Sequence, residues 1–138
     1  MAGFMDSVSY LAFKRASRWF QSAGRAIEDR RWDDAAYNCQ MAVEHALKAL
    51  LMSKGFIFKR VHDVTDVLVK LKEDSALSTY IRTNIDKMAE ILIFLTDLRG
   101  LAGYGFEEGV DEHYFEKIAP EAMNKAKFVL ETLSEHFR

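Results

Sequence analysis

The chain has 138 residues, of which 49% are apolar and 29% charged, a composition that excludes a disordered or fibrous protein and indicates one domain over residues 1–138. Its net charge of −2 excludes a strongly basic polyanion-binding protein of the usual kind. A lone cysteine, no secretion-signal pattern at the start and no apolar run long enough for a membrane span lead us to expect a soluble cytoplasmic protein without membrane contact.

Charge is unevenly distributed along the chain. Residues 1–31 carry six basic and three acidic side chains, whereas residues 107–138 carry eight acidic and four basic ones. Such ends either pair with each other as neighbouring helices of opposite charge or steer a charged partner. We favour pairing between helices, because it is the commoner arrangement.

Apolar residues recur every three or four positions, which predicts long helices and no strands. The first helix is expected from about Asp6 to Arg30. Its inward stripe comprises Val8, Ala12, Ala16, Trp19, Ala23 and Ile27. The second helix is expected to start at Asp33 as its N-cap and to end before Gly55. Its stripe comprises Ala36, Cys39, Val43, Ala46 and Leu50.

A short third helix should follow His62, with Asp63 as its cap. Its inward residues are Val64, Val67, Leu68 and Leu71. The fourth helix has the most regular pattern, with alternating spacings of four and three that are typical of a bundle seam. The seam residues are Ile81, Ile85, Met88, Leu92 and Leu95. The next position in this series is Arg99.

Residues 100–113 contain four glycines and are expected to form the only substantial loop. A fifth helix is expected over Pro120–Phe137, with Pro120 in its first turn, where no intrahelical donor is needed. Short connections make successive helices antiparallel, and no internal repeat indicates a solenoid. The sequence therefore predicts an all-α fold, an up-and-down bundle of four main helices plus one short helix.

Most motifs that carry chemistry are missing. The four histidines and the single cysteine lack the spacing of metal ligands, so we expect no metal and no cofactor. The segment from Gly103 to Gly109 misses the glycine spacing of a phosphate loop and follows a helix, which indicates a turn. Cys39 lies on an apolar stripe without a nearby histidine, which is typical of a buried core residue.

Two sets of polar residues remain as candidates. Gln40, Glu44 and Lys48 lie four apart on one helix face, where an intrahelical pair between Glu44 and Lys48 is a sufficient explanation and the lining of a groove is the alternative. Arg99 falls on the inward seam, where an unpaired guanidinium is costly. It either caps the carbonyls of its helix end or holds a phosphate beside the glycine-rich segment, and we favour the phosphate.

These residues carry a family pattern. Asn38, Gln40, Glu44, Ala46 and the run from Lys48 to Leu50, followed by Gly55 and the run from His62 to Val64, resemble the signature of the HEPN domain (higher eukaryotes and prokaryotes nucleotide-binding). The stretch from Leu98 to Tyr104, with Arg99 and Ala102, is similar to the second block of that family. The resemblance covers nearly the whole chain.

The resemblance implies an all-α bundle, often a homodimer in which the helix ends of the second block meet. It also implies an association with a minimal nucleotidyltransferase, as companion subunit or as part of a toxin–antitoxin pair. Many members are metal-independent ribonucleases with a motif of Arg, a polar residue, three to five further residues and His. Here Arg99 matches the arginine, Gly100 replaces the polar residue and Tyr104 stands where the histidine is expected.

This departure changes the expected chemistry. A phenol with an ordinary pKa near 10 is a poor proton shuttle at neutral pH, whereas an imidazole near 6.5 is well suited. His113 lies 14 residues beyond Arg99, outside the range of the motif. Some companions of nucleotidyltransferases carry AMP on a tyrosine two residues after the motif histidine, but Phe106 occupies that position here. The resemblance therefore implies no robust ribonuclease activity.

The leading hypothesis is a non-catalytic protein that binds a nucleotide or nucleic-acid phosphate through Arg99 and Tyr104, with Gln40, Glu44 and Lys48 beside them. The expected assembly is a homodimer that accompanies a minimal nucleotidyltransferase. The homodimer is suggested by apolar residues that the core stripes do not need, namely Trp19, Phe20, Trp32, Ile91, Phe94 and Leu98. One alternative is an RNA-cleaving toxin with Arg99, Tyr104 and His113 gathered across a dimer interface. Another is a purely structural homodimeric adaptor.

Overall fold

The computed structural model describes residues 2–56 and 64–138, including the side chains from Ser7 onward. Four long helices form the body of the molecule: α1 (Ala2–Glu28), α2 (Trp32–Ser53), α5 (Ile85–Tyr104) and α6 (Glu112–Ser134). Two short helices, α3 (Val64–Lys70) and α4 (Thr79–Thr83), precede α5. Three 3-10 turns complete the described structure: η2 (Leu71–Glu73), η3 (Gly105–Glu108) and η4 (Glu135–Phe137).

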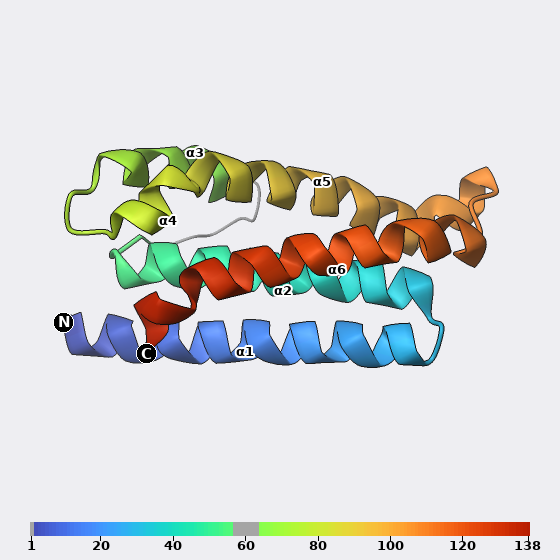
Figure 1. Ribbon diagram of the computed structural model, residues 1–138, viewed down its shortest axis with the longest axis horizontal. Coiled ribbons are helices and arrows are strands. Elements are labelled where there is room, and N and C mark those ends of the chain that lie inside the picture. Colours follow the sequence, from blue (N-terminus) through green and yellow to red (C-terminus); the bar gives the residue numbers. More distant parts are fainter. Residues whose placement is uncertain (1, 57–63) are drawn as a thin grey trace.

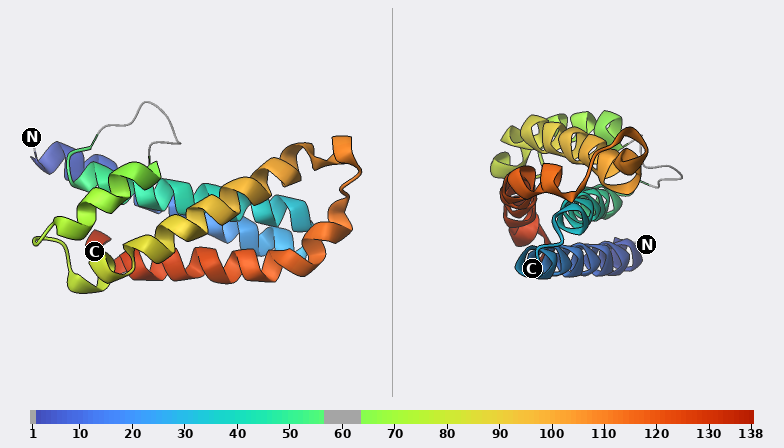
Figure 2. Two further views of the ribbon diagram at one scale, coloured as in Figure 1. Left: turned by 90° about the horizontal axis from the view of Figure 1, so that it is seen from above. Right: turned by 90° about the vertical axis from the view of Figure 1, so that its right-hand side faces the viewer.

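The long helices run side by side along the molecule, with both ends of the chain at the same end of the bundle (Figure 1). The end view in Figure 2 shows α2 near the middle, between α1 and α5, with α6 along one side. Helix α2 packs against each of these three helices. The prediction of an all-α, up-and-down bundle with four main helices is confirmed, with two short helices in place of the expected one. Within the described residues, no helix is both long and apolar enough to cross a membrane.

The core is built from the predicted stripes. All five stripe residues of α2, from Ala36 to Leu50, are completely buried. On α1, Ala16 and Ala23 are buried in the main core, and Ala12 and Trp19 pack half-buried against it. Val8 is also half-buried, and Ile27 packs half-buried against a second, small cluster of alanines from α1, α2 and α6. Alanines at these positions let the backbones of α1 and α2 approach closely, so the interface fills with short side chains.

The seam predicted for the fourth helix is confirmed residue by residue, since all five of its members are buried. The helix itself is divided at Asn84, between α4 and α5. The Asn84 amide donates to the Tyr80 carbonyl at 2.8 Å, so the side chain takes an acceptor that a continuing helix uses for its backbone. The apolar pattern continues across this break because both helices face the same core.

Several expected boundaries are wrong. Helix α1 begins near residue 2 and ends at Glu28. Helix α2 begins at Trp32, so Asp33 lies in its first turn and is not the N-cap. The predicted end before Gly55 is confirmed, with Gly55 at a φ of +89°, the left-handed conformation that glycine adopts most easily. The predicted cap Asp63 lies outside the described residues.

The expected loop over residues 100–113 is also wrong. Helix α5 continues through Gly100 and Gly103 to Tyr104, and only Gly109 among the glycines of this segment has a positive φ, of +84°. A glycine inside a helix costs about 1 kcal/mol relative to alanine, which the packing of Leu98 and Leu101 against the core offsets. The apolar spacing therefore decides the local structure, and glycine content alone is misleading.

The last helix starts eight residues earlier than expected. Asp111 is its N-cap, with the side chain accepting from the backbone N–H of His113 at 3.0 Å, and Pro120 lies inside the helix. Proline removes one intrahelical hydrogen bond, but its neighbours Ala119 and Ala122 are completely buried against the bundle. Tertiary packing on both sides of Pro120 thus keeps the helix continuous.

Much of the apolar surface expected to support a dimer is part of the bundle. Ile91 and Leu98 are 3% exposed, and Trp19, Phe20, Trp32 and Phe94 pack half-buried against the core. Helix α6 approaches α5 closely enough for Lys125 to lie over the Phe94 ring, at 5.2 Å from its centroid. These six residues are accounted for within one chain, so they do not indicate a partner.

The turn between α1 and α2 contains a residue under strain. Arg30 has a φ of +60°, and the N–H of Arg31 bonds to the carbonyl of Ala26 at 2.8 Å, as in the helix-ending motif that favours glycine. Because a side chain in this conformation costs roughly 1 kcal/mol or more, Arg30→Gly is expected to raise the free energy of unfolding by about 0.5–1 kcal/mol. Urea denaturation of both proteins measures the difference, and a less stable variant contradicts it.

An ion pair ties the end of α2 to the turn after η2. Lys54 Nζ lies 3.1 Å from Asp74 Oδ2, and this contact, helped by a bond from the Ala76 backbone, lowers the pKa of the Asp74 carboxyl. A lowered folded-state pKa gives stability that is present above the unfolded pKa, near 4, and is lost as the pH falls. We therefore expect Asp74→Asn to be less stable than the native chain at pH 7 and equally stable near pH 2. Thermal unfolding of both proteins between pH 2 and pH 7 measures the difference in their stability. A difference that does not change with pH contradicts the ion pair as its cause.

Candidate functional site

The candidate site is built around Arg99, in the last turns of α5. The seam residue Leu95 and its neighbour Leu98 are buried and fix the rotation of the helix, which leaves Arg99 at the boundary between core and surface. Its side chain is 32% exposed. The Arg99 side chain is therefore only partly exposed. It faces the buried side chains of α2 on its inner side and an open cavity on its outer side.

On the inner side, α2 presents a buried amide and a buried carboxylate. Gln40 is completely buried and Glu44 is 4% exposed. The Gln40 amide nitrogen donates to Glu44 Oε1 at 2.9 Å and to the Thr96 hydroxyl at 3.4 Å. Lys48 Nζ lies 3.5 Å from the other carboxylate oxygen of Glu44. The Glu44 charge is thus compensated inside the bundle, as a buried carboxylate requires.

Arg99 joins this cluster through one nitrogen. Its Nη1 donates to Gln40 Oε1 at 3.1 Å, lies 3.9 Å from Glu44 Oε1 and contacts the Met41 sulfur at 3.6 Å. Among the described residues, Nε and Nη2 have no hydrogen-bond partner. The Gln40 amide therefore directs its oxygen to the Arg99 guanidinium and its nitrogen to the Glu44 carboxylate, and these contacts fix the orientation of Arg99. The edge of the guanidinium that carries Nε and Nη2 stays available to a ligand.

On the outer side, Arg99 lines an open cavity of about 330 Å³. The other lining residues are Tyr37, Thr96, Gly100, Gly103 and Tyr104. The Arg99 guanidinium lies over the Tyr37 ring at 5.7 Å from its centroid, and Tyr104 is 71% exposed. Among the described residues, no carboxylate lines this cavity, and the guanidinium is the one formal charge in that lining.

The two glycines widen the approach to Arg99. A Cβ atom added to Gly100 or Gly103 meets nothing within 4 Å, which shows that neither glycine is required by close packing inside the bundle. Their missing side chains instead leave the helix backbone open beside the guanidinium. A flat wall of this kind lets a planar or bulky ligand come near Arg99.

The five predicted site residues lie in three different places relative to the cavity. Arg99 and Tyr104 line the cavity together. Gln40 and Glu44 contact Arg99 from inside and are too buried to line a groove, which leaves the groove alternative unsupported. Lys48 forms the intrahelical ion pair with Glu44 that its spacing predicts.

Three neighbours of Arg99 are missing from the sequence prediction. Tyr37 and Met41 lie on α2 within a turn of Gln40, and Thr96 lies one turn before Arg99 on α5. Residues three or four apart on a helix share a face, so this spacing was the available signal. It identifies them only once the rotation of α2 against α5 is known.

The other reactive side chains lie elsewhere. His113 is exposed near the start of α6, where its Nδ1 lies 3.7 Å from Glu116, and it lines a different, shallow depression with Tyr114 and Lys117. Cys39 is buried with its sulfur 3.4 Å from that of Met123, and burial raises the pKa of its thiol to about 12. The prediction that Cys39 is a core residue is confirmed, and its thiol is held in the unreactive protonated form.

The sequence matches a known protein family. The family model of the HEPN domain matches residues 10–136, which is nearly the entire chain and includes every residue of the cavity and of the buried cluster. No curated protein and no solved structure matches the chain.

Proposed function

Because this chain belongs to the HEPN domain family, which is associated with nucleotides and RNA, we propose that it binds the phosphate of a nucleotide or nucleic acid at Arg99 without cleaving it. The observation that carries the proposal is the available edge of the guanidinium. Arg99 lines an open cavity, and its Nε and Nη2 have no partner among the described residues. Two parallel N–H groups on one edge match two oxygens of a phosphate.

The buried cluster supports this role by holding the guanidinium in place. Arg99 has already lost much of its side-chain freedom through Gln40 and Glu44, so less is lost when a ligand binds. The Glu44 carboxylate lies on the far side, where Lys48 also compensates its charge. Arg99 together with Glu44 and Lys48 therefore keeps a net charge of +1, and this positive charge attracts an anion.

The aromatic walls fit the rest of a nucleotide. Tyr37 on α2 and Tyr104 at the end of α5 border the cavity, and both are exposed. Either ring can stack on a base, and either hydroxyl can donate a hydrogen bond to a phosphate or sugar oxygen. The part of the chain that the structure describes places no carboxylate in the lining, which also favours a ligand with negative charge.

The non-catalytic part of the proposal is supported by what surrounds Arg99. Tyr104 stands where the ribonucleases of this family have histidine, and His113 lines a different depression. Within the described lining, no imidazole or carboxylate is placed to move a proton at the phosphate. From its family alone, and not from the apolar residues that pack within the bundle, we further propose that the chain acts as a homodimer and as the companion subunit of a minimal nucleotidyltransferase in the cytoplasm.

Calorimetric titration with AMP, ATP and GMP tests the phosphate site. The native chain is expected to bind at least one of these nucleotides, and Arg99→Ala is expected to weaken that binding about tenfold or more, since a charge-assisted pair is lost. Arg99→Lys should fall between the two, because an ammonium keeps the charge and loses the fork. Arg25→Ala removes an exposed arginine of α1 and serves as the matched control.

Two results contradict the proposal. One is equal binding by the native chain and Arg99→Ala, which moves the site elsewhere. The other is cleavage of labelled RNA by the native chain in EDTA that disappears in Arg99→Ala, which makes the chain a metal-independent ribonuclease.

A further inference from the structure

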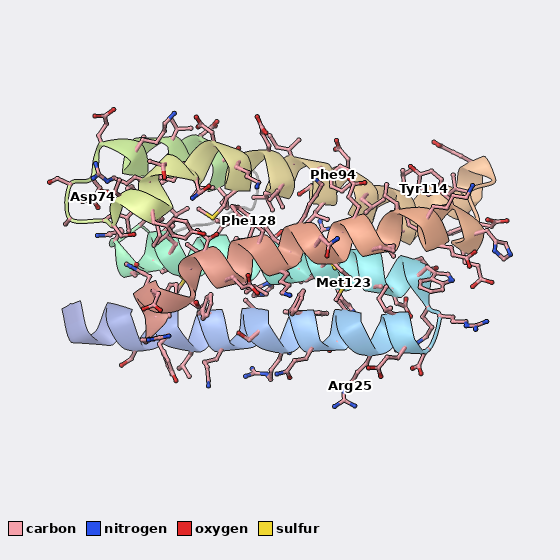
Figure 3. The ribbon with its side chains drawn as sticks, viewed as in Figure 1. Arg25, Asp74, Phe94, Tyr114, Met123 and Phe128 are labelled. Atoms are coloured by element: carbon pink, nitrogen blue, oxygen red, sulfur yellow. The ribbon has the colours of Figure 1, made fainter. Side chains whose placement is uncertain are left out.

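The solvent-facing side of α1 carries a continuous positive charge. Residues 7–27 contain Lys14, Arg15, Arg18 and Arg25 and no acidic residue, and all four side chains are exposed. Figure 3 shows Arg25 pointing away from the bundle. At 1.5 Å per residue, the stretch from Lys14 to Arg25 is roughly 16 Å long. This is a strong local charge in a chain whose net charge is −2.

The four cations are not paired with any acidic side chain that the structure describes. Among the described residues, none of them lies within ion-pair distance of a carboxylate, and no ion pair joins α1 to the acidic helix α6. Two of them rest on aromatic rings instead, Lys14 over Tyr10 at 5.6 Å and Arg15 over Trp19 at 4.7 Å. A ring orients a cation and leaves its full charge in place. The pairing expected between the basic first helix and the acidic last helix is therefore not observed for these four cations.

A series of contacts leads from this face to the phosphate site. Arg15 lies over Trp19, and the Trp19 ring lies 6.2 Å from the His45 ring on α2. His45 Nδ1 is 2.7 Å from the carbonyl oxygen of Met41, whose sulfur contacts Arg99 Nη1. Helix α2 lies between α1 and α5 (Figure 2), so this series of contacts connects the two outer helices through residues of α2.

We propose that the ligand of the Arg99 site is a single-stranded polynucleotide whose backbone continues past His45 onto the Arg15 and Arg18 side of α1. This inference rests on the proposed function, because it extends the ligand held at Arg99. One mononucleotide cannot reach both ends of such a path, whereas a chain of phosphates meets a cation at each end. Unpaired bases can stack on Tyr37 and Tyr104, which paired bases in a duplex cannot do.

The residue types favour phosphates over other anionic surfaces. Three of the four cations of the face are arginines, which bind phosphate oxygens in a bidentate manner. Among the described side chains of α1, the exposed large hydrophobic residues are Leu11, at 65%, and Tyr10, at 44%, whose ring lies under Lys14. A helix that inserts into a lipid surface needs a broad apolar face, and the apolar face of α1 is occupied by the core.

Fluorescence anisotropy with a labelled single-stranded RNA of about 12 nucleotides, a length typical of such binding sites, tests the inference. We compare the native chain, Arg15→Gln/Arg18→Gln, and the matched control Lys70→Gln/Lys117→Gln, which removes two exposed cations elsewhere. The arginine variant is expected to bind the RNA about fivefold more weakly. Its slope of log affinity against log salt should be smaller by about 1.4, from two lost phosphate contacts at about 0.7 each. AMP binding should not change.

The outcomes separate this inference from the proposed function. A native chain that does not bind AMP contradicts the phosphate site itself. A native chain that binds AMP but holds the RNA no more tightly, or an arginine variant that matches the control pair on RNA, contradicts the path onto α1 alone. Equal binding of a duplex of the same sequence contradicts the single-stranded ligand, and binding of anionic vesicles in place of RNA overturns the choice of phosphodiester backbone. Far-UV circular dichroism confirms that each variant is folded.

Discussion

Glu44→Ala is expected to lower the free energy of unfolding by about 2–3 kcal/mol. The carboxylate is 4% exposed and accepts from Gln40 while lying between Lys48 and Arg99. Its removal leaves a buried amide without its main acceptor and two cations without their shared anion. Breaking a fully buried pair costs about 3–5 kcal/mol, and the partial exposure of both cations reduces that figure here.

Urea denaturation of the native chain, Glu44→Ala and Glu44→Gln measures this effect. Glu44→Gln keeps an acceptor for Gln40 and loses the charge, so its stability should lie between the other two. Glu90→Ala removes an exposed carboxylate of α5 and should stay within about 0.5 kcal/mol of the native chain. If Glu44→Ala is no less stable than Glu90→Ala, the buried cluster does not hold α2 against α5.

Leu50→Ala is expected to destabilise the chain by about 3 kcal/mol. Leu50 is completely buried near the end of α2, the helix that contacts α1, α5 and α6. The loss combines the transfer free energy of the removed atoms with the cavity they leave, which the surrounding helices fill only in part. For a chain of this size the midpoint of thermal unfolding should fall by roughly 10 °C.

Leu11→Ala is the matched control for this prediction, because Leu11 is a leucine on α1 that is 65% exposed. Its midpoint should change by about 2 °C or less, since an exposed leucine loses little contact. Differential scanning calorimetry of the three proteins gives both values. Equal midpoints for the two variants would mean that the predicted stripe of α2 does not form the core.

The fold could be predicted from the sequence where the apolar spacing is regular. The stripe of α2 and the seam from Ile81 to Leu95 identify buried residues correctly, because a helix that buries one face repeats an apolar residue every three to four positions. The division at Asn84 was missed, because the seam continues across it and the side-chain bond to Tyr80 leaves no trace in the spacing.

The sequence predicts the end of the bundle near Arg99 less well, because packing there outweighs the conformational preferences of single residues. Four glycines indicated a loop, yet α5 continues to Tyr104, and Pro120 indicated a helix start, yet α6 begins at Glu112. Local preferences of about 1–3 kcal/mol are overcome when the neighbouring residues are buried.

For the site, the sequence identified Arg99 and its buried neighbours but not how they are arranged. The spacing of Gln40, Glu44 and Lys48 shows that they share a face, and only the packing of α2 against α5 shows that Gln40 and Glu44 reach Arg99. Tyr37 and Thr96 were missed for the same reason, since contacts between helices depend on rotations that periodicity does not specify.

The central claim is that the available edge of Arg99 receives a phosphate, and nuclear magnetic resonance of arginine side chains tests it most directly. AMP is titrated into the ¹⁵N-labelled native chain while the Nε–H signals of Arg99 and Arg25 are followed. We expect the Arg99 signal to shift in proportion to bound AMP, and the Arg25 signal on α1 to stay in place. Saturation with AMP that leaves the Arg99 signal unmoved would contradict the claim.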